Sequence, residues 1–399
     1  MTPAGWISKK LWELTYWDKR FNGVDKSKQK KILPFKHVSA EKLKSICVRG
    51  GKIKLLATGK FDGYTTKDLA QDDVNCGEVL TLPSGGTAAI KYFNGTFVDS
   101  GNIIAQTSDA EQYCLKFIYY YLMCINNVIA KEYRGTSIKH PYMPAILELS
   151  IPVPSLSEQQ QIVEKLDALF ADIEKEKQIA QQNLQNAKEL FESELNKLFT
   201  ENTGWEHKKL SEVAIDFGRG KSKHRPRNDK CLYGGPYPFI QTGDIRNSKH
   251  YITSYTQTYN ETGLAQSKLW PKGTLCITIA ANIAETGILD FDACFPDSVI
   301  GCTFDNNKTN AYFVEYLLQS FKSVLQAKGK GSAQDNINLG TFENQFFPFP
   351  EKSVQDRIVQ KLDTLREQIQ ELEQIYTQQI ADLDELKQAI LKKAFNGEL

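Results

Sequence analysis

Histidine and paired cysteines are scarce in this chain. Its 399 residues include five histidines and eight cysteines, and no two cysteines form a C-x-x-C pair. Structural zinc sites are usually built from such pairs, often together with closely spaced histidines. The sequence therefore argues against a metal site and predicts reduced, free thiols.

Long apolar runs are also missing. No stretch approaches the ~20 apolar residues that a membrane span requires, and the first residues, MTPAGWISKK, lack the apolar region of a signal peptide. We therefore expect a cytoplasmic protein.

The known catalytic signatures are absent as well. There is no Gly-rich phosphate loop before Lys-Ser/Thr, no dinucleotide fingerprint after a strand, and no Asn-Pro-Pro-aromatic signature of amino-methyltransferases. The stretch 218–221 lacks the spacing of a phosphate loop and is better explained as a basic turn. Asp290 and Asp292 are typical turn residues rather than a nuclease metal site. The sequence predicts a protein without catalytic residues of its own.

What the chain does have is a repeat of 196 residues. The stretch SEQQQIVEKLDAL at 157–169 returns as SVQDRIVQKLDTL at 353–365. The offset continues without a gap back through the proline turns and forward to Phe199 and Phe395. Solenoid repeats are far shorter, about 20–50 residues. The repeat predicts two like modules in tandem, and such a pseudo-two-fold arrangement suits a ligand with two-fold symmetry, such as duplex DNA.

Each repeated block opens a long amphipathic segment. Apolar or small residues recur at steps of three and four over five or more turns, with Glu, Gln and Lys between them. This pattern predicts two long helices, at 156–200 and 351–399, with Ser157 and Ser353 as N-caps. About forty helical residues span roughly 60 Å. Because an exposed apolar seam of that length would be unstable, we expect the helices to pair as an antiparallel coiled coil.

The rest of the chain is predicted to be α+β, mainly β with packed helices. Segment 1–155 has an aromatic stretch at 114–129 that is long enough for a buried helix. Segment 201–350 repeats the order, with a strand-like stretch at 273–280 and a helical one at 311–326. The expected organisation is two globular domains, 1–155 and 201–350, each followed by a helix. Strand-like pieces in the first domain lie at 52–57, 77–82, 87–93 and 101–107.

The net charge of +1 hides a separation of charge. Lys and Arg outnumber Asp and Glu by 21 to 14 in residues 1–156 and by 16 to 15 in residues 201–350. The helical segments are acidic, with 5 against 9 in 157–200 and 7 against 10 in 351–399. A field that gathers phosphates would come from the globular segments, mostly the first. Such an excess supports nucleic-acid binding only weakly by itself.

The best nucleic-acid candidate is the basic stretch RGKSKHRPRNDK at 219–230. Its Gly and Pro disfavour a helix, and basic loops of this kind contact phosphates, while Arg can also read guanine. The stretch FIQTGDIR at 239–246 follows, and a second Gly-bearing basic loop occupies 328–336. Solvated loops and an ordinary strand and turn are the alternative interpretations. The DNA-binding candidates here are Arg219, Lys221, Lys223, Arg225, Arg227, Gln241, Thr242, Arg246, Lys328, Lys330, Ser332 and Gln334.

The first globular segment has a counterpart of the second basic loop. It lies at 131–139, opposite 328–336 in the repeat, and predicts a backbone clamp shared by both segments rather than a simple helix-ending Gly turn. Other basic and hydroxyl groups lie earlier in the chain, with less specificity. The candidates in this segment are Lys52, Lys54, Lys60, Tyr64, Arg134, Thr136, Ser137 and Lys139.

Together these features resemble one known family, the DNA-specificity subunits of type I restriction-modification enzymes. The resemblance covers the whole chain. It rests on IPVPSLSEQQQIVEKLDAL at 151–169, FPFPEKSVQDRIVQKLDTL at 347–365, GWEHKKLSEVA at 204–214 and QAILKKAFNGEL at 388–399. It implies that each globular domain is a target-recognition domain reading one half of a bipartite, asymmetric site in double-stranded DNA.

The resemblance also implies partners. The paired helices would act as a spacer and as docking surfaces for two modification subunits, which bind S-adenosylmethionine and methylate adenine. Restriction subunits with ATP-driven translocation would be further partners. The chain itself would bind no cofactor and would work in a bacterial or archaeal cytoplasm. The first domain departs from the family pattern at 6–15 and 26–36, so family contacts transfer less readily to it.

Two other classes of protein remain open on the sequence. A coiled-coil scaffold would organise proteins through its acidic helices without DNA binding. A stand-alone nuclease or methyltransferase would carry a site that no known motif reveals. Gel shift with partner subunits on duplex DNA tests the first, and methyl transfer by the purified chain tests the second.

Overall fold

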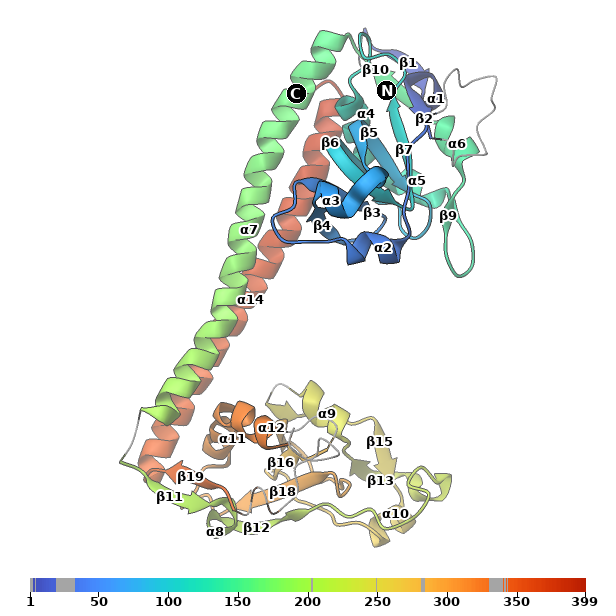
Figure 1. The fold of residues 1–399 in the computed structure, drawn as a ribbon. Coiled ribbons are helices and arrows are strands. Elements are labelled where there is room, and N and C mark those ends of the chain that lie inside the picture. Colours follow the sequence, from blue (N-terminus) through green and yellow to red (C-terminus); the bar gives the residue numbers. More distant parts are fainter. Residues whose placement is uncertain are drawn as a thin grey trace. The chain divides into compact units, whose positions relative to one another are not determined.

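The structure is a computed structural model that describes residues 3, 5–18, 33–201, 204–248, 250–280, 284–329, 340, 342 and 344–399. It divides into two compact units, Met1–Ala180 with Gln378–Leu399 (unit 1) and Gln181–Thr377 (unit 2). The division cuts both long helices, so each unit contains one globular part and one end of each helix (Figure 1).

Unit 1 is built on a six-stranded sheet in the order β2–β7–β5–β6–β3–β4. All neighbours are antiparallel except β3 and β6, which run parallel. The strands are β2 (Thr15–Trp17), β3 (Ile53–Ala57), β4 (Asp62–Thr65), β5 (Asn75–Pro83), β6 (Lys91–Ser100) and β7 (Asn102–Thr107). Two further pairs join β1 (Ile7–Lys10) to β10 (Ser150–Val153) and β8 (Tyr133–Arg134) to β9 (His140–Pro141). The helices of the globular part are α1 (Leu11–Leu14), α2 (Ala40–Ser45), α3 (Lys67–Ala70), α4 (Leu115–Cys124), α5 (Asn126–Lys131) and α6 (Met143–Leu147).

The central strand of this sheet is covered on both faces. Leu80 and Leu82 of β5 are fully buried in a cluster with Ile118 of α4, whereas Val79 packs in another cluster with Phe35. Successive side chains of a strand point to opposite faces, so one apolar run supplies both cores. Full burial of one such side chain stabilises the fold by about 1.5–3 kcal/mol.

Unit 2 repeats this topology. Its five-stranded sheet has the order β12–β18–β16–β17–β14, and only β14 and β17 are parallel. The strands are β12 (Ala214–Arg219), β14 (Tyr251–Ile252), β16 (Leu275–Thr278), β17 (Thr286–Leu289) and β18 (Val299–Phe304). Two further pairs join β11 (Glu206–Lys209) to β19 (Phe346–Phe349) and β13 (Tyr233–Phe239) to β15 (Gln257–Tyr259). The helices are α8 (Leu210–Val213), α9 (Thr242–Asn247), α10 (Glu261–Ala265), α11 (Ala311–Ser320) and α12 (Lys322–Gly329).

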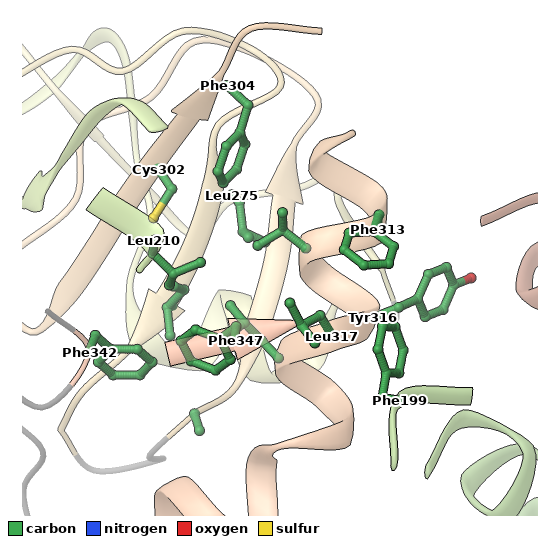
Figure 2. Packing of buried hydrophobic residues seen from close by; sticks show 14 of the residues in the cluster. Phe199, Leu210, Leu275, Cys302, Phe304, Phe313, Tyr316, Leu317, Phe342 and Phe347 are labelled. Carbon is green, nitrogen blue, oxygen red and sulfur yellow. The ribbon is translucent and has the colours of Figure 1, made fainter. Parts of the chain in front are cut away.

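The strands and helices lie close to their predicted places. The predicted aromatic helix at 114–129 is broken at Ile125 into α4 and α5, and its counterpart is broken at Phe321 into α11 and α12. The strand predicted at 87–93 begins only at Lys91, because a turn follows β5. Buried aromatic residues from several elements form the core of unit 2 (Figure 2).

Two long helices, α7 (Leu156–Thr200) and α14 (Lys352–Phe395), follow the globular parts. The predicted N-caps are wrong, because Ser157 and Ser353 lie inside the first turns. The Ser155 hydroxyl accepts a hydrogen bond from the Glu158 backbone, 3.4 Å away, and therefore caps α7. The predicted helix ranges, 156–200 and 351–399, nevertheless begin within one residue of the observed starts, Leu156 and Lys352.

In unit 1 the two helices pack against each other. Lys177 of α7 forms an ion pair with Asp384 of α14, with 2.6 Å between Nζ and Oδ1. The Lys387 ammonium lies 4.9 Å from the centre of the Phe170 ring. Residue numbers rise along one helix as they fall along the other, so the pair is antiparallel.

Unit 2 has the same antiparallel pairing. Lys361 of α14 forms an ion pair with Glu194 of α7 at 3.2 Å, and the Arg366 guanidinium lies 5.1 Å from the Phe191 ring centre. The aromatic residue and the cation have exchanged helices between the two units, since Arg366 is the repeat counterpart of Phe170. The predicted α+β class with an antiparallel coiled coil and a pseudo-two-fold repeat is confirmed.

Each globular part is attached to the helix that follows it by the same contact. The Tyr120 hydroxyl of α4 donates to the Asp167 carboxylate of α7 at 2.5 Å. In unit 2 the Tyr316 hydroxyl of α11 donates to Asp363 of α14, also at 2.5 Å. Both pairs are 47 residues apart in the chain and are related by the 196-residue offset.

A buried glutamine makes a second repeated attachment. The Gln159 side chain accepts from the Cys114 backbone at 2.8 Å, and Gln355 accepts from the Asn310 backbone at 2.9 Å. Each glutamine also donates to the carbonyl of a preceding proline. The amides thereby fix the starts of α4 and α11 relative to the long helices, and buried hydrogen bonds of this kind stabilise a fold by about 1 kcal/mol each.

An aromatic pair completes the attachment in each unit. Phe117 of α4 packs against Phe395 of α14, with ring centres 5.3 Å apart. Phe313 of α11 packs against Phe199 of α7, with ring centres 5.5 Å apart. Both residues are labelled in Figure 2. Both long helices therefore contact the globular part in each unit.

All eight cysteines are free. In the described part of the chain, no helix combines the length and the apolar character needed to cross a bilayer.

Candidate nucleic-acid interface

The structure brings together two stretches of unit 2 that the sequence singled out separately. Arg227 from the 219–230 loop lies beside Gln241 and Thr242 at the start of α9, and all three line a cavity of about 340 Å³. The other lining residues are Ser222, Asn228, Tyr233, Phe239, Gln257, Pro296 and Ser298. Gln257 was not predicted, because it lies on β15 and its position depends on the pairing of β15 with β13.

Two glutamine side chains meet at this cavity. The Gln241 amide nitrogen lies 2.7 Å from the Gln257 amide oxygen. The Gln241 backbone N–H is held by the Asp244 carboxylate at 2.8 Å, and Gln257 pairs with Phe239 in the strand ladder. The backbone of both glutamines is therefore fixed by hydrogen bonds within the protein.

One residue, Asp297, engages two of the predicted arginines. The Arg227 guanidinium forms an ion pair with Asp297 at 2.8 Å, and Arg219 Nε donates to the Asp297 backbone carbonyl at 2.6 Å. These contacts hold the two ends of the basic loop against the segment before β18. Because the Asp297 carboxylate offsets the charge of Arg227, this arginine contributes less to attraction of phosphate than the sequence suggested.

The remaining cations of the loop differ in whether they are bonded within the protein or exposed to solvent. Arg225 folds back and donates to the Ser222 carbonyl at 2.7 Å. Lys221 and Lys223 are exposed. These two lysines are therefore well placed for phosphate contacts.

The loop is shaped by Asp229. Its carboxylate accepts from the Cys231 backbone N–H at 3.0 Å and lies 3.0 Å from His224 Nε2. The backbone hydrogen bond from Cys231, followed by the bond to His224, lowers the pKa of Asp229 to about 2. Ligand atoms of these three residues lie within 4.8 Å of one another. The imidazole and the carboxylate are already hydrogen-bonded to each other, so this cluster serves the shape of the loop.

The other candidates in unit 2 are less informative. Arg246 is exposed on the last turn of α9. Lys328 lies in α12, and the structure does not describe its side chain. Lys330, Ser332 and Gln334 lie outside the described residues, so half of the predicted shared clamp does too.

In unit 1 the candidate stretch 131–139 contains β8 and the loop 135–139 that joins β8 to β9, and this loop is bound to a second loop. The Gly86 backbone N–H donates to the Lys139 carbonyl at 2.8 Å. Thr136, Ser137 and Lys139 are exposed there. Ile138, which the sequence analysis overlooked, is 62 % exposed between them.

Arg134 stands at the base of this loop. Its guanidinium forms an ion pair with Glu132 at 3.0 Å and lies 3.8 Å from the centre of the Tyr142 ring. The planar group is thereby held in one orientation, which suits a bidentate contact with a phosphate or a base.

The remaining candidates of unit 1 lie on the β3–β4 hairpin. Lys54 pairs with Asp62 and lies 4.4 Å from the Tyr64 ring centre. Burial opposes the charge of Lys54, but the bond to Asp62 outweighs it and raises the pKa of Lys54. Lys52 and Lys60 are exposed. The free positive charge of this hairpin therefore lies on these two lysines.

Comparison with known proteins identifies a family. Residues 27–182 and 202–381 match the family described as "Type I restriction modification DNA specificity domain". The chain is similar to the type I restriction enzyme EcoBI specificity subunit of Escherichia coli, with 24 % identity over 320 residues, 72 % of this chain and 66 % of that protein. It is also similar to the EcoDI specificity subunit of Escherichia coli, with 24 % identity over 398 residues, 88 % of this chain and 87 % of that protein.

Solved structures share the fold. One, described as the structural basis of complex assembly and conformational transition of the type I R-M system, has a TM-score of 0.72 and 20 % identity, with 100 % of both chains covered. The HsdS subunit from Thermoanaerobacter tengcongensis has a TM-score of 0.56 and 20 % identity, with 100 % of this chain and 98 % of that chain covered. At such identity these likenesses concern the fold alone. The family match extends over most of the sequence, and this chain therefore belongs to the DNA-specificity subunits of type I restriction-modification systems, which supply sequence recognition and are not the catalytic subunits.

Proposed function

We propose that this chain reads a bipartite, asymmetric site in double-stranded DNA. Residues 1–155 and 201–350 are the two target-recognition domains, and each reads one half of the site. Residues 156–200 and 351–399 are the spacer helices between them. A helical spacer keeps a defined length, which a flexible linker would not.

One observation carries this proposal: the two globular domains are attached to the long helices in the same way, but they present different polar surfaces. Tyr120 with Asp167, and Tyr316 with Asp363, attach the two domains through the same geometry. The polar surfaces beyond the attachments differ, because unit 1 presents the loop from β8 to β9 and unit 2 presents the glutamine-lined cavity. Two different surfaces on domains that are attached in the same way suit two different half-sites on one duplex.

Contacts to phosphate supply affinity in this proposal, and base contacts supply sequence preference. Exposed cations lie on loops of both domains: Lys52, Lys60 and Lys139 in the first, Lys221 and Lys223 in the second. Each phosphate contact releases counterions, so the affinity falls steeply as salt is added.

We also infer that the coiled coil docks two modification subunits. Leu169 and Leu386 are 37 % and 47 % exposed in unit 1. Their repeat counterparts in unit 2 are Leu365 and Leu190, which line one groove of about 610 Å³. Leu190 is 47 % exposed and Leu365 is half-buried. Leucines that recur at the same two repeat positions on the helix surfaces suit two copies of one partner.

Adenine methylation belongs to those partners in this proposal. They bind S-adenosylmethionine, this chain binds no cofactor, and restriction subunits join in the full complex. The complex works in the cytoplasm of a bacterium or archaeon, where chromosomal DNA is accessible.

The test is a map of methylated adenines in the host genome, with and without this gene. We expect two unlike half-sequences separated by a constant gap, and loss of both when the gene is deleted. Exchange of residues 201–350 for those of a relative should change one half-sequence only. The reconstituted complex should also shift a duplex that carries the site. A complex that assembles but shifts no duplex would instead support the protein scaffold.

A further inference from the structure

We propose that the Gln241–Gln257 pair reads the major-groove edge of one adenine in the half-site of the second domain. This inference rests on the proposed DNA recognition and adds the base and the atoms that read it. It assigns base contacts to Gln257, which no sequence pattern indicated, and not to the arginines of the basic loop.

The first argument is that the two amides are pre-organised. Gln241 directly precedes α9, and the Asp244 carboxylate bonds to its backbone N–H. The same carboxylate accepts from Thr256, next to Gln257, at 3.2 Å. One acidic side chain therefore joins the backbone of Gln241 to the side chain of the residue before Gln257. Side chains on such fixed supports lose little further entropy when they bind a ligand.

The second argument is chemical complementarity. The hydrogen bond between the glutamines uses one amide N–H and one amide oxygen. In either of the two orientations that keep this bond, a carbonyl oxygen of one glutamine and an amino group of the other remain for a ligand. Adenine presents an N6 donor beside an N7 acceptor in the major groove, and glutamine is a common bidentate partner of this edge. Guanine presents two acceptors there, so the pair fits it less well.

The third argument concerns the surroundings. Asp297 already engages Arg227 at the same cavity, which weakens the competing guanine contact by that arginine. Lys221 and Lys223 of the adjoining loop are exposed and can hold the phosphates on either side. Phosphate contacts thus position the duplex, and the glutamine pair supplies the sequence preference.

The experiment uses the full chain in complex with its modification subunits and a duplex that carries the mapped site. Each adenine of the second half-site is replaced in turn by 7-deazaadenine, which removes the N7 acceptor and retains N6. We expect the wild-type complex to bind about fivefold more weakly at one position only, the lower end of the range for a bidentate contact, because the bond to N6 is retained. The Gln241→Leu and Gln257→Leu complexes should lose this sensitivity at that same position.

Matched controls distinguish failure of the adenine contact from failure of the proposed DNA recognition. Gln345→Leu changes a glutamine of unit 2 that does not line the cavity, and it should retain the full 7-deazaadenine effect. If the wild-type and Gln241→Leu complexes respond alike at every adenine, the adenine contact is wrong although the chain still recognises DNA. If the wild-type complex binds no duplex, the recognition function fails and the adenine contact fails with it.

Discussion

His37 lies 2.7 Å from the Asp99 carboxylate, and the two side chains are only 4 % and 0 % exposed. The other ring nitrogen lies 2.9 Å from Asp18, which is equally buried. A charged imidazole thus joins two buried carboxylates and fixes the segment before α2 to β2 and β6. Without this partner the two acids would be buried near each other, at a considerable cost.

This arrangement predicts a pH-dependent stability. Burial opposes the charge of His37, but the hydrogen bonds to Asp18 and Asp99 outweigh it and raise the pKa of His37 above 6.5. The pKa of His37 is therefore higher in the folded state than in the unfolded state. The contribution of His37 to stability is complete below about pH 6.5 and is lost as pH rises through its folded-state pKa. We expect His37→Gln to lower the unfolding free energy by about 3 kcal/mol at low pH and by less at high pH. Urea unfolding from about pH 5.5 to 9 measures the difference, and a constant difference would contradict this account.

The two tyrosine attachments predict unequal effects of the same substitution. Asp167 is also bound by Lys116 at 2.7 Å, whereas the repeat counterpart of Lys116 is Tyr312. Tyr120→Phe should therefore destabilise unit 1 by about 1 kcal/mol, and Tyr316→Phe should destabilise unit 2 by more, about 2 kcal/mol. Hydrogen exchange of each unit resolves the two effects. Equal losses would show that Lys116 contributes nothing to the attachment.

The basic loop predicts a specific salt dependence of DNA binding. Substitution of Lys221 and Lys223 by Ala should weaken binding and lower the slope of log K against log salt by about two. Arg225→Ala with Arg227→Ala should have the same direction of effect but a smaller one, because both side chains are engaged within the protein. Fluorescence anisotropy at several salt concentrations measures the slopes. If all slopes are unchanged, the loop lies outside the interface.

Removal of the Asp297 charge should increase the affinity of the complex for DNA. Asp297→Asn removes the charge that engages Arg227, so this arginine becomes available to phosphate. We expect binding of any duplex to become several-fold tighter at low salt, since electrostatic attraction to phosphate does not depend on sequence. The same anisotropy titration, repeated with a scrambled duplex, provides the control. Weaker binding by this variant would mean that the ion pair shapes the DNA surface.

The four repeat-related leucines predict the number of bound modification subunits. Leu190→Glu with Leu365→Glu should remove one subunit, and Leu169→Glu with Leu386→Glu should remove the other, because a buried, unpaired carboxylate opposes association. Native mass spectrometry of the complex should show a change from two copies to one. Gln185→Glu, an exposed change on the same helix outside these positions, is the control. Retention of two copies in both leucine variants would place the docking surface elsewhere.

Local periodicity explains why so much of the fold could be predicted. The steps of three and four along α7 and α14, and the repeat that relates them, depend only on residues close in the chain. The N-cap of α7 was misplaced by two residues, because Ser155, rather than Ser157, caps this helix. The choice among neighbouring serines depends on the backbone after the proline, which composition does not reveal.

The candidate site was less accessible to sequence reasoning. The basic loop was found by its charge, but the Asp297 carboxylate that engages Arg227 comes from 70 residues further along the chain. Gln257 meets Gln241 only through the ladder of β13 and β15. Contacts between distant segments depend on strand register, and no local pattern encodes that register.

The repeated attachments have an evolutionary consequence. Gln159, Tyr120 and Phe117, like Gln355, Tyr316 and Phe313, hold each domain at its base, and none of them lies in the loops that carry the candidate contacts. Loop residues can therefore mutate with little loss of folding stability. A lineage can acquire a new preference in one half of its target while the other half, and the assembly with its partners, stay as they were.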